Sequence, residues 1–312
     1  MQQYNNATIK QLNNATMTRK QINIIEFQSK IQRPLILDGA IGSLLQQRNL
    51  KMHKNLWSSF ANIVNPEKVI EIHKEYINAG ADIITTNTFR TNPIAYNQSN
   101  LGISNTEFVK ASVNLAIEVI DGNENIFIAG SNPPAEDSYQ EFRKATQNEI
   151  EVNHRKHIDM LWNSGVDFIL NETQSHFDEI KIICEHCGEN NIPFIVSLFV
   201  TNEGKILSGE KLDEIIEFVE NFNPIAVGIN CVTPQIFSKI ISEIRSPKRR
   251  GFYLNCGSGN YTDINIFEGV TPAEYLAIIK NNYVNNPFFI GTCCGSTPAH
   301  TLAIKEYLIG KN

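Results

Sequence analysis

The sequence lacks any apolar run of the roughly 18 residues that a membrane-spanning helix needs. It also lacks a dense basic stripe: 27 Lys and Arg stand against 33 Asp and Glu, a formal net charge of −6. The tightest basic run, Lys248-Arg249-Arg250, is interpreted as a solvated turn. We therefore expect neither a membrane nor nucleic acid as the main partner.

Cysteine is sparse, with six residues in a chain of 312, and no secretory signal pattern is visible. Cysteines used in this way are typical of a reducing compartment, where thiols stay free for metal binding or chemistry. We therefore predict a cytoplasmic protein. The oligomeric state stays undetermined, because the sequence shows no long apolar surface stripe.

Two regions differ in composition. Residues 1–30 are rich in Asn, Gln, Thr and Lys and repeat Asn-Asn-Ala-Thr at 5–8 and 13–16, which predicts a disordered, low-complexity extension. The remainder, residues 31–312, has the apolar content of an ordinary globular protein and is long enough for one barrel-sized domain.

From residue 34 onward, apolar runs alternate with amphipathic stretches. Strands are predicted at residues 35–38, 82–88, 126–131, 167–172, 193–200, 225–231, 251–255 and 288–292. Helices are predicted at residues 66–79, 106–121, 147–164, 177–190, 212–221, 234–245, 272–282 and 298–308. This regular succession predicts the α/β class and a single (β/α)₈ TIM barrel, with catalytic residues at the carboxyl ends of the strands.

Three cysteines follow two of the late strands. Cys293 and Cys294 come after the apolar run at 288–290, and Cys231 ends the strand at 225–231. For the vicinal thiols to converge the chain must turn, which Gly291 and Gly295 permit. Three thiolates suggest a zinc site with an open fourth position, as catalytic zinc sites have.

Other polar residues also stand at strand ends: Asp38, Asn87, Glu172 and Asn255. In a barrel they would share one mouth with the cysteines. Two buried carboxylates beside a thiolate-rich metal are costly unless a cation arrives with the substrate. A ligand that carries an ammonium group and a thiol meets this demand.

The combined motifs resemble the homocysteine S-methyltransferase family over residues 34–309. They are Asp38-Gly39-Ala40, Asn87-Thr88-Phe89, Glu172-Thr173, Gly228-Ile-Asn-Cys231 and Gly291-Thr-Cys-Cys-Gly295. The resemblance implies a homocysteine-binding barrel that holds Zn²⁺ through Cys231, Cys293 and Cys294.

By the same resemblance, Asp38 and Glu172 would hold the amino group of homocysteine, and the amides near Gly39 and Ala40 its carboxylate. Asn87 matches a position that approaches the zinc in some relatives when substrate is absent. Asn255 is taken as a further substrate-binding candidate, because it ends a strand at the same mouth.

The expected reaction is methyl transfer to the zinc-bound thiolate of homocysteine, or of a seleno-analogue, giving methionine from homocysteine. A free thiol has a pKa of roughly 8.5, and metal coordination deprotonates it. The loop at 130–139 departs from the family's Gly-Pro-Tyr-Gly pattern, and residues 41–49 lack the aromatic residues expected of betaine users. A sulfonium donor, S-methylmethionine or S-adenosylmethionine, is therefore favoured.

Two alternatives stay open at this point: a zinc hydrolase or lyase on the same barrel, and a non-catalytic zinc- or thiol-binding relative. Other cysteines and histidines are interpreted as structural. Cys184 and Cys187 lie on one apolar helix stripe, Cys256 is expected to be a packed thiol, and His300 to cap or pack the last helix.

Overall fold

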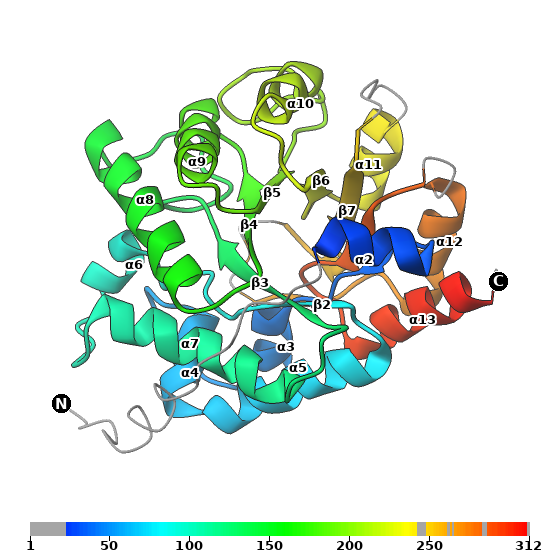
Figure 1. Ribbon diagram of the computed structural model, residues 1–312, viewed down its shortest axis with the longest axis horizontal. Helices are drawn as coiled ribbons and strands as arrows, with labels where there is room; N and C mark the ends of the chain where they lie inside the picture. Colours follow the sequence, from blue (N-terminus) through cyan, green and yellow to red (C-terminus); the bar gives the residue numbers. More distant parts are fainter. Residues whose placement is uncertain (1–22, 242–247, 261–262, 264, 283–285, 311–312) are drawn as a thin grey trace.

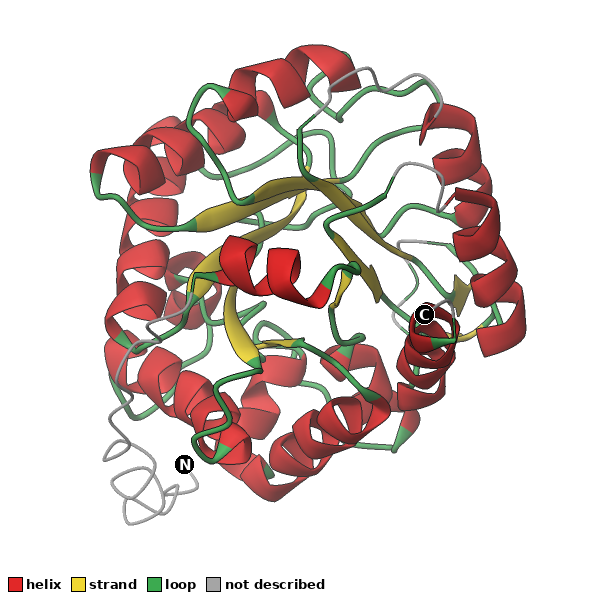
Figure 2. Ribbon diagram, turned by 45° about the vertical axis from the view of Figure 1, so that its right-hand side comes forward, coloured by secondary structure: helices red, strands yellow, loops and turns green. Residues whose placement is uncertain are grey.

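The computed structural model describes residues 23–241, 248–260, 263, 265–282 and 286–310. Eight strands form one parallel sheet, surrounded by helices (Figures 1 and 2). They are β1 (Leu35–Ile36), β2 (Ile83–Thr85), β3 (Phe127–Asn132), β4 (Phe168–Gln174), β5 (Phe194–Leu198), β6 (Ala226–Asn230), β7 (Arg250–Leu254) and β10 (Phe289–Thr292). Each lies within a residue or two of a strand predicted from sequence, except that the ends of β1 and β2 are shorter.

The sheet closes on itself. Its strand order is β1-β10-β7-β6-β5-β4-β3-β2, and the two outer strands meet through a parallel bridge between Leu37 and Ile83. The amide of Asp38 donates to the Ile83 carbonyl at 3.0 Å, and the amide of Asp82 to the Ile36 carbonyl at 2.8 Å. The predicted (β/α)₈ barrel is thus confirmed.

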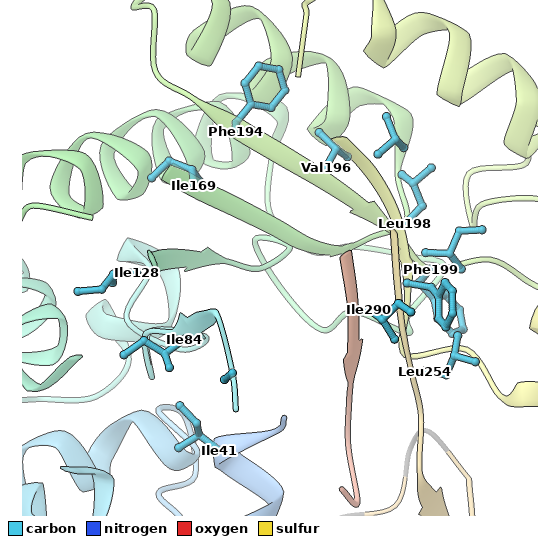
Figure 3. Packing of buried hydrophobic residues seen from close by; sticks show 14 of the residues in the cluster. Ile41, Ile84, Ile128, Ile169, Phe194, Val196, Leu198, Phe199, Leu254 and Ile290 are labelled. Carbon is cyan, nitrogen blue, oxygen red and sulfur yellow. The ribbon is translucent and has the colours of Figure 1, made fainter. Parts of the chain in front are cut away.

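Side chains alternate between the two faces of each strand, as the period of an extended chain requires. On β1, Leu35 packs with the barrel interior and Ile36 with the surrounding helices. Figure 3 shows outward-facing residues of successive strands, among them Ile84, Ile128 and Ile169. Inward-facing residues of the strands, among them Leu35 and Phe127, fill the interior. The barrel is therefore a packed core, with its site at one end.

The helices outside the sheet are α3 (Ile41–Gln47), η1 (Ser58–Phe60), α4 (Ala61–Val64), α5 (Pro66–Ala79), α6 (Pro93–Asn97), α7 (Asn105–Ile120), α8 (Gln147–Asn163), α9 (Phe177–Glu189), α10 (Leu212–Glu220), α11 (Pro234–Ile240), α12 (Pro272–Asn282) and α13 (Pro298–Ile309). The eight predicted helices, α5 and α7 to α13, lie close to their predicted positions. The predicted helix at 234–245 extends past α11 into residues outside the described range. In the part of the chain that the structure describes, no helix has the length and apolar character to cross a bilayer.

One prediction needs correction at the start of the chain. Residues 1–30 were expected to be disordered, but Ile24–Ile31 form helix α2, capped by the Asn23 side chain, which accepts from the Ile25 amide at 2.8 Å. Ile24 is buried in the inner cluster of the barrel, and the Phe27 ring packs against Phe127 in a tilted arrangement with ring centroids 5.3 Å apart. Figure 2 shows α2 lying across the barrel end, so it closes the amino-terminal mouth. Residues 1–22 lie outside the described residues.

Short elements absent from the sequence prediction shape the opposite mouth. They are α3, η1, α4 and α6, together with the hairpin of β8 (Gly257–Ser258) and β9 (Phe267–Glu268). Each is too short to show a hydrophobic period, which is why a pattern search does not find it. Residues of η1 and of β8 line the cavity described next.

Candidate metal centre and substrate cavity

A cavity of about 420 Å³ opens at the carboxyl ends of the barrel strands. All nine site residues predicted from the sequence line it: Asp38, Gly39, Ala40, Asn87, Glu172, Cys231, Asn255, Cys293 and Cys294. These residues come from six different strand ends and meet only because the sheet closes. Their common location is what a (β/α)₈ enzyme site requires.

The three cysteine sulfurs form a compact cluster. Cys231 Sγ lies 3.0 Å from Cys293 Sγ and 3.6 Å from Cys294 Sγ, and all three atoms lie within 4.8 Å of one another. Thiolates of a tetrahedral metal site with metal–sulfur bonds of about 2.3 Å would be about 3.8 Å apart. The cluster therefore fits a single metal ion with only a small outward movement of the sulfurs.

The turn that aims both vicinal thiols at one point lies at Gly295. Its φ is +82°, and a Cβ there would lie 2.4 Å from the backbone of Gly257. Its amide donates to Ser43 Oγ at 3.0 Å, which ties the turn to α3. Gly291, also expected to permit a turn, instead lies inside β10, where a Cβ would meet the Leu37 side chain at 2.7 Å.

A residue that sequence reasoning did not single out contacts the cluster. Tyr139 Oη donates to Cys231 Sγ at 3.1 Å from the loop after β3, and its ring packs edge-on against Phe199. Hydrogen bonds with Cys293 and Cys294, with the Tyr139 hydroxyl adding to them, hold the pKa of Cys231 well below its usual value. The site thus favours a thiolate at Cys231 even before a metal is considered.

Asp38 is buried and receives two hydrogen bonds from Thr85, from the amide at 2.8 Å and from the hydroxyl at 2.7 Å. Burial raises the pKa of Asp38 to about 8, although the hydrogen bonds from Thr85 oppose that rise. The charge of Glu172 adds to it. A cation in the cavity would reverse this effect, because it stabilises the ionised form.

Glu172 faces the same cavity from β4. Burial raises its pKa to about 7, while hydrogen bonds to Ser131 and Tyr253 oppose the rise and the nearby Cys231 increases it. Ser131 lies at the end of β3 and also lines the cavity. Within the described residues, no Lys, Arg or His forms an ion pair with Asp38 or Glu172, so the two acidic side chains are suited to receive a cationic ligand.

Asn87 lines the cavity, but its amide is already engaged. Its Nδ2 donates to Ser58 O at 3.0 Å and to Asn62 Oδ1 at 2.9 Å, and its Oδ1 accepts from Ser58 Oγ at 3.0 Å. These bonds hold η1 and α4 at the rim of the barrel. A role for Asn87 beside the metal stays a prediction, and its visible role is to position this rim.

Asn255, at the end of β7, is held in a similar way. Its side-chain Oδ1 accepts from the Gly257 backbone N–H at 2.7 Å, and the backbone N–H of Asn255 donates to the Val232 carbonyl at 3.0 Å. The side chain thereby shapes the turn into β8. Contact with substrate stays a prediction for this residue.

Aromatic rings and a cation form one part of the cavity wall. Trp57 and Phe89 meet edge to face with ring centroids 6.1 Å apart, and Tyr139 lies nearby on the wall. Arg90 Cζ lies 5.3 Å from the Phe89 ring centroid. Residues 41–49, where an aromatic donor site was expected, contain no aromatic residue; the rings come instead from Trp57, just before η1, and from the loops after β2 and β3.

The remaining cysteines and the last histidine behave as expected. Cys184 and Cys187 are fully buried on α9, and burial raises the pKa of Cys187 to about 12. Cys256 is buried, and its thiol contacts the Leu254 carbonyl at 3.6 Å. His300 Nδ1 accepts from the Thr297 amide at 3.1 Å, a capping contact at the start of α13.

The fold and the site together define a (β/α)₈ enzyme with a three-cysteine centre that could hold a metal, opposed by two buried carboxyl groups. A family model described as homocysteine S-methyltransferase matches residues 35–308. The chain belongs to the homocysteine S-methyltransferase family. This membership confirms the resemblance seen in the sequence and the predicted class of enzyme, a methyl-group transferase with a thiol acceptor.

Individual relatives are distant but match along nearly their whole length. Homocysteine S-methyltransferase 1 of Zea mays is 24% identical, with 88% of this chain and 94% of the relative covered. A selenocysteine Se-methyltransferase of Brassica oleracea var. italica is 23% identical, covering 88% and 89%. The metallated form of the homocysteine methyltransferase MmuM from Escherichia coli superposes with a TM-score of 0.77 at 21% identity, covering 91% of this chain and 100% of that one.

Proposed function

We propose that this protein is a zinc-dependent S-methyltransferase that moves a methyl group from a sulfonium donor to the sulfur of homocysteine, giving methionine. Residues 31–312 act as the homocysteine-binding domain in this proposal. The observation that carries it is the meeting of three cysteine sulfurs within 4.8 Å of one another in the cavity that Asp38 and Glu172 also line.

Cys231, Cys293 and Cys294 would hold the zinc. When bound by three thiolates, zinc lowers the pKa of a further thiol while leaving its sulfur electron-rich. The set contains sulfur ligands alone, which suits thiol chemistry better than the histidine-rich sets typical of activated water. The donor set thus favours alkyl transfer to sulfur over hydrolysis.

Asp38 and Glu172 would bind the ammonium group of homocysteine. Their pKa values are raised to about 8 and about 7 in the absence of a cation. An ammonium group between them would favour the ionised carboxylates and convert a desolvation cost into an ion pair. The amides near Gly39 and Ala40 would receive the carboxylate of the amino acid.

The transfer itself needs alignment and little else from the protein. The thiolate sulfur attacks the methyl carbon, a sulfur–carbon bond forms, and the bond from the methyl group to the donor sulfonium breaks. The donor leaves as a neutral thioether, so no proton has to be supplied to it. Holding both sulfurs in line with the methyl carbon accounts for much of the expected acceleration.

The rings of Trp57, Phe89 and Tyr139 supply a surface for the cationic donor. A cation over an aromatic face is stabilised by roughly 0.5–2 kcal/mol. Aromatic residues alone do not separate a sulfonium from a quaternary ammonium ion, so the choice of donor belongs to this proposal. A seleno-analogue of homocysteine would fit the same acceptor position.

A cytoplasmic location belongs to this proposal, because the proposed metal centre needs reduced cysteines. All six cysteines are free thiols in the structure, including the three of the metal centre. Thiolates must stay reduced to hold zinc, which a reducing compartment ensures.

The test is methionine formation by the zinc-loaded protein from homocysteine, with S-methylmethionine, S-adenosylmethionine and glycine betaine offered separately. We expect transfer from a sulfonium donor and one zinc per chain. Turnover of a donor without any thiol acceptor would support a hydrolase or lyase instead. Homocysteine binding without transfer from any donor would identify a non-catalytic relative.

A further inference from the structure

We propose that Arg90 and Asp137 form a second amino-acid subsite, which binds the carboxylate and the ammonium group of an α-amino-acid sulfonium donor. This inference rests on the proposed function and names the residues that select its donor. Both side chains line the cavity, and the Arg90 guanidinium lies over the Phe89 ring, 5.3 Å from its centroid. The subsite uses residues other than Asp38 and Glu172, which serve the acceptor in the proposed function.

Arg90 is held in place with most of its hydrogen-bonding capacity unused. Its amide donates to Ser59 Oγ at 3.1 Å, and its Nη1 donates to the Glu136 carbonyl at 2.6 Å. Within the described residues, no carboxylate forms an ion pair with this guanidinium. A half-buried guanidinium that faces a cavity with free N–H groups is suited to a carboxylate, which it binds in two-point geometry.

Asp137 supplies the opposite charge from the loop after β3. Its Oδ1 accepts from the Tyr139 amide at 2.9 Å, which fixes the carboxylate at the cavity edge, where it is exposed. Burial lowers the pKa of Arg90, and the nearby Asp137 carboxylate opposes this. Because both side chains line one cavity, a single zwitterion could contact the two opposite charges.

Side chains from α9 and hydrogen bonds within the loop hold the loop that carries Asp137 in place. The buried Glu179 on α9 accepts from the Ala135 amide at 2.8 Å and pairs with Arg143 at 2.8 Å and with His154 at 2.5 Å. The Glu136 side chain accepts from the Lys144 amide at 2.6 Å. This is the stretch where the sequence departs from the family pattern.

Charge and size both favour an amino-acid donor. The acceptor ammonium already has two carboxyl groups, so Arg90 and Asp137 remain as a pair of opposite charges for a second zwitterion. Homocysteine and S-methylmethionine together are about as large as one drug-sized ligand, for which cavities of roughly 300–1,000 Å³ are usual. The cavity of about 420 Å³ lies near the lower limit, so the nucleoside of S-adenosylmethionine would have to extend outside it.

The experiment separates the two charges by using donors that lack one or both of them. S-methylmethionine has a carboxylate and an ammonium group, dimethylsulfoniopropionate has only the carboxylate, and trimethylsulfonium has neither. The variants are Arg90→Gln, Arg90→Lys and Asp137→Asn, the last of which keeps the Oδ1 acceptor for Tyr139. The measurement is KM and kcat for each donor at saturating homocysteine, with donor binding by calorimetry in the absence of homocysteine.

We expect Arg90→Gln to raise KM about 10- to 100-fold for S-methylmethionine and dimethylsulfoniopropionate, as loss of a charge-assisted hydrogen bond would. Arg90→Lys should recover part of this loss. Asp137→Asn should raise KM for S-methylmethionine alone. Neither change should affect trimethylsulfonium or the KM of homocysteine.

Controls come from two other cations. Arg155→Gln removes a guanidinium on α8 that pairs with Glu151 outside the cavity, and it should change no KM value. Lys54→Gln removes a second cation of the cavity wall. If this variant raises the donor KM while Arg90→Gln does not, the assignment to Arg90 is overturned.

Failure of this inference and failure of the proposed function give different results. If the Arg90 and Asp137 variants transfer methyl groups with unchanged donor KM values, the subsite assignment is wrong and the proposed function still holds. If no donor supports transfer but S-methylmethionine binding still depends on Arg90, the proposed function is wrong and the subsite assignment still holds.

Discussion

The side chain of Asn230 holds Thr173 by two hydrogen bonds across the end of β5. The Thr173 amide donates to Asn230 Oδ1 at 2.9 Å, and Asn230 Nδ2 donates to Thr173 Oγ1 at 2.8 Å. Thr173 has a φ of +58° and Cys231 a φ of +56°, conformations that cost about 1–3 kcal/mol each for such residues. Because Thr173 follows Glu172 and Asn230 precedes Cys231, this contact positions both a carboxyl group and a metal-site sulfur.

Replacing Asn230 should therefore affect stability and the site together. Asn230→Ala removes both hydrogen bonds and leaves buried groups of Thr173 unpaired, so we expect the free energy of unfolding to fall by roughly 1–3 kcal/mol. Metal content and kcat/KM should fall as well. Denaturant unfolding and metal analysis check this, with the exposed Asn148→Ala as the control. Wild-type metal content and activity in Asn230→Ala would contradict the positioning role.

The cysteine series tests the metal centre directly. Cys231→Ala, Cys293→Ala and Cys294→Ala should each lose metal, and activity should fall by more than the roughly 10–100-fold usual when only a supporting partner is lost. Cys256→Ala and Cys184→Ala remove buried thiols outside the sulfur cluster and should keep the metal. Metal content by elemental analysis, with circular dichroism for folding, is the measurement. Metal retained in Cys231→Ala would remove that residue from the ligand set.

Gly39 leaves no room for a side chain. A Cβ at this position would lie 2.6 Å from Ser296 Oγ and from Tyr76 Oη, and 2.8 Å from Thr292 Oγ1. Gly39→Ala should cost about 1–3 kcal/mol of stability, as overpacking does, and weaken homocysteine binding. Gly102→Ala is the matched control, because a Cβ there meets nothing within 4 Å. Thermal unfolding and homocysteine titration of both variants are the measurements. Equal stability and equal homocysteine affinity of the two variants would contradict the prediction for Gly39.

The raised pKa of Asp38 should make the stability of the metal-free protein depend on pH. Its pKa is about 8 when folded and near 4 when unfolded, so between these values the folded chain retains a proton that the unfolded chain has lost. Its contribution therefore makes stability fall as pH rises from about 4 to about 8, by at most about 1.4 kcal/mol per pH unit. Homocysteine should reduce this fall, because its ammonium group favours the ionised carboxylate.

Asp38→Asn should remove that part of the pH dependence and weaken homocysteine binding by about 10- to 100-fold. The measurement is the difference between wild-type and variant unfolding free energies across pH 5 to 8, with and without homocysteine. A difference that does not change with pH would show that Asp38 is already ionised in the folded protein. Thr85→Val, which removes one of its hydrogen bonds, should raise the pKa of Asp38 further.

The order of the strands and helices and the location of the site could be predicted from local patterns in the sequence. The eight strands and the main helices follow from apolar periodicity, since a strand repeats every two residues and a helix every 3.6. The cysteines at two strand ends and the acidic residues at two others indicated the site, because strand ends of a closed barrel share one mouth. The family motifs strengthened that prediction.

What the sequence alone determined, then, was the order of elements and the residue types at their ends. Tertiary structure decided that α2 covers the other mouth, that Tyr139 reaches Cys231, and that Asn230 holds Thr173. It also gathered Arg90 with aromatic rings from separate loops. The physical reason is that periodicity reports the burial of neighbouring residues, whereas contacts between distant loops depend on how the closed sheet and its short rim elements place them in space.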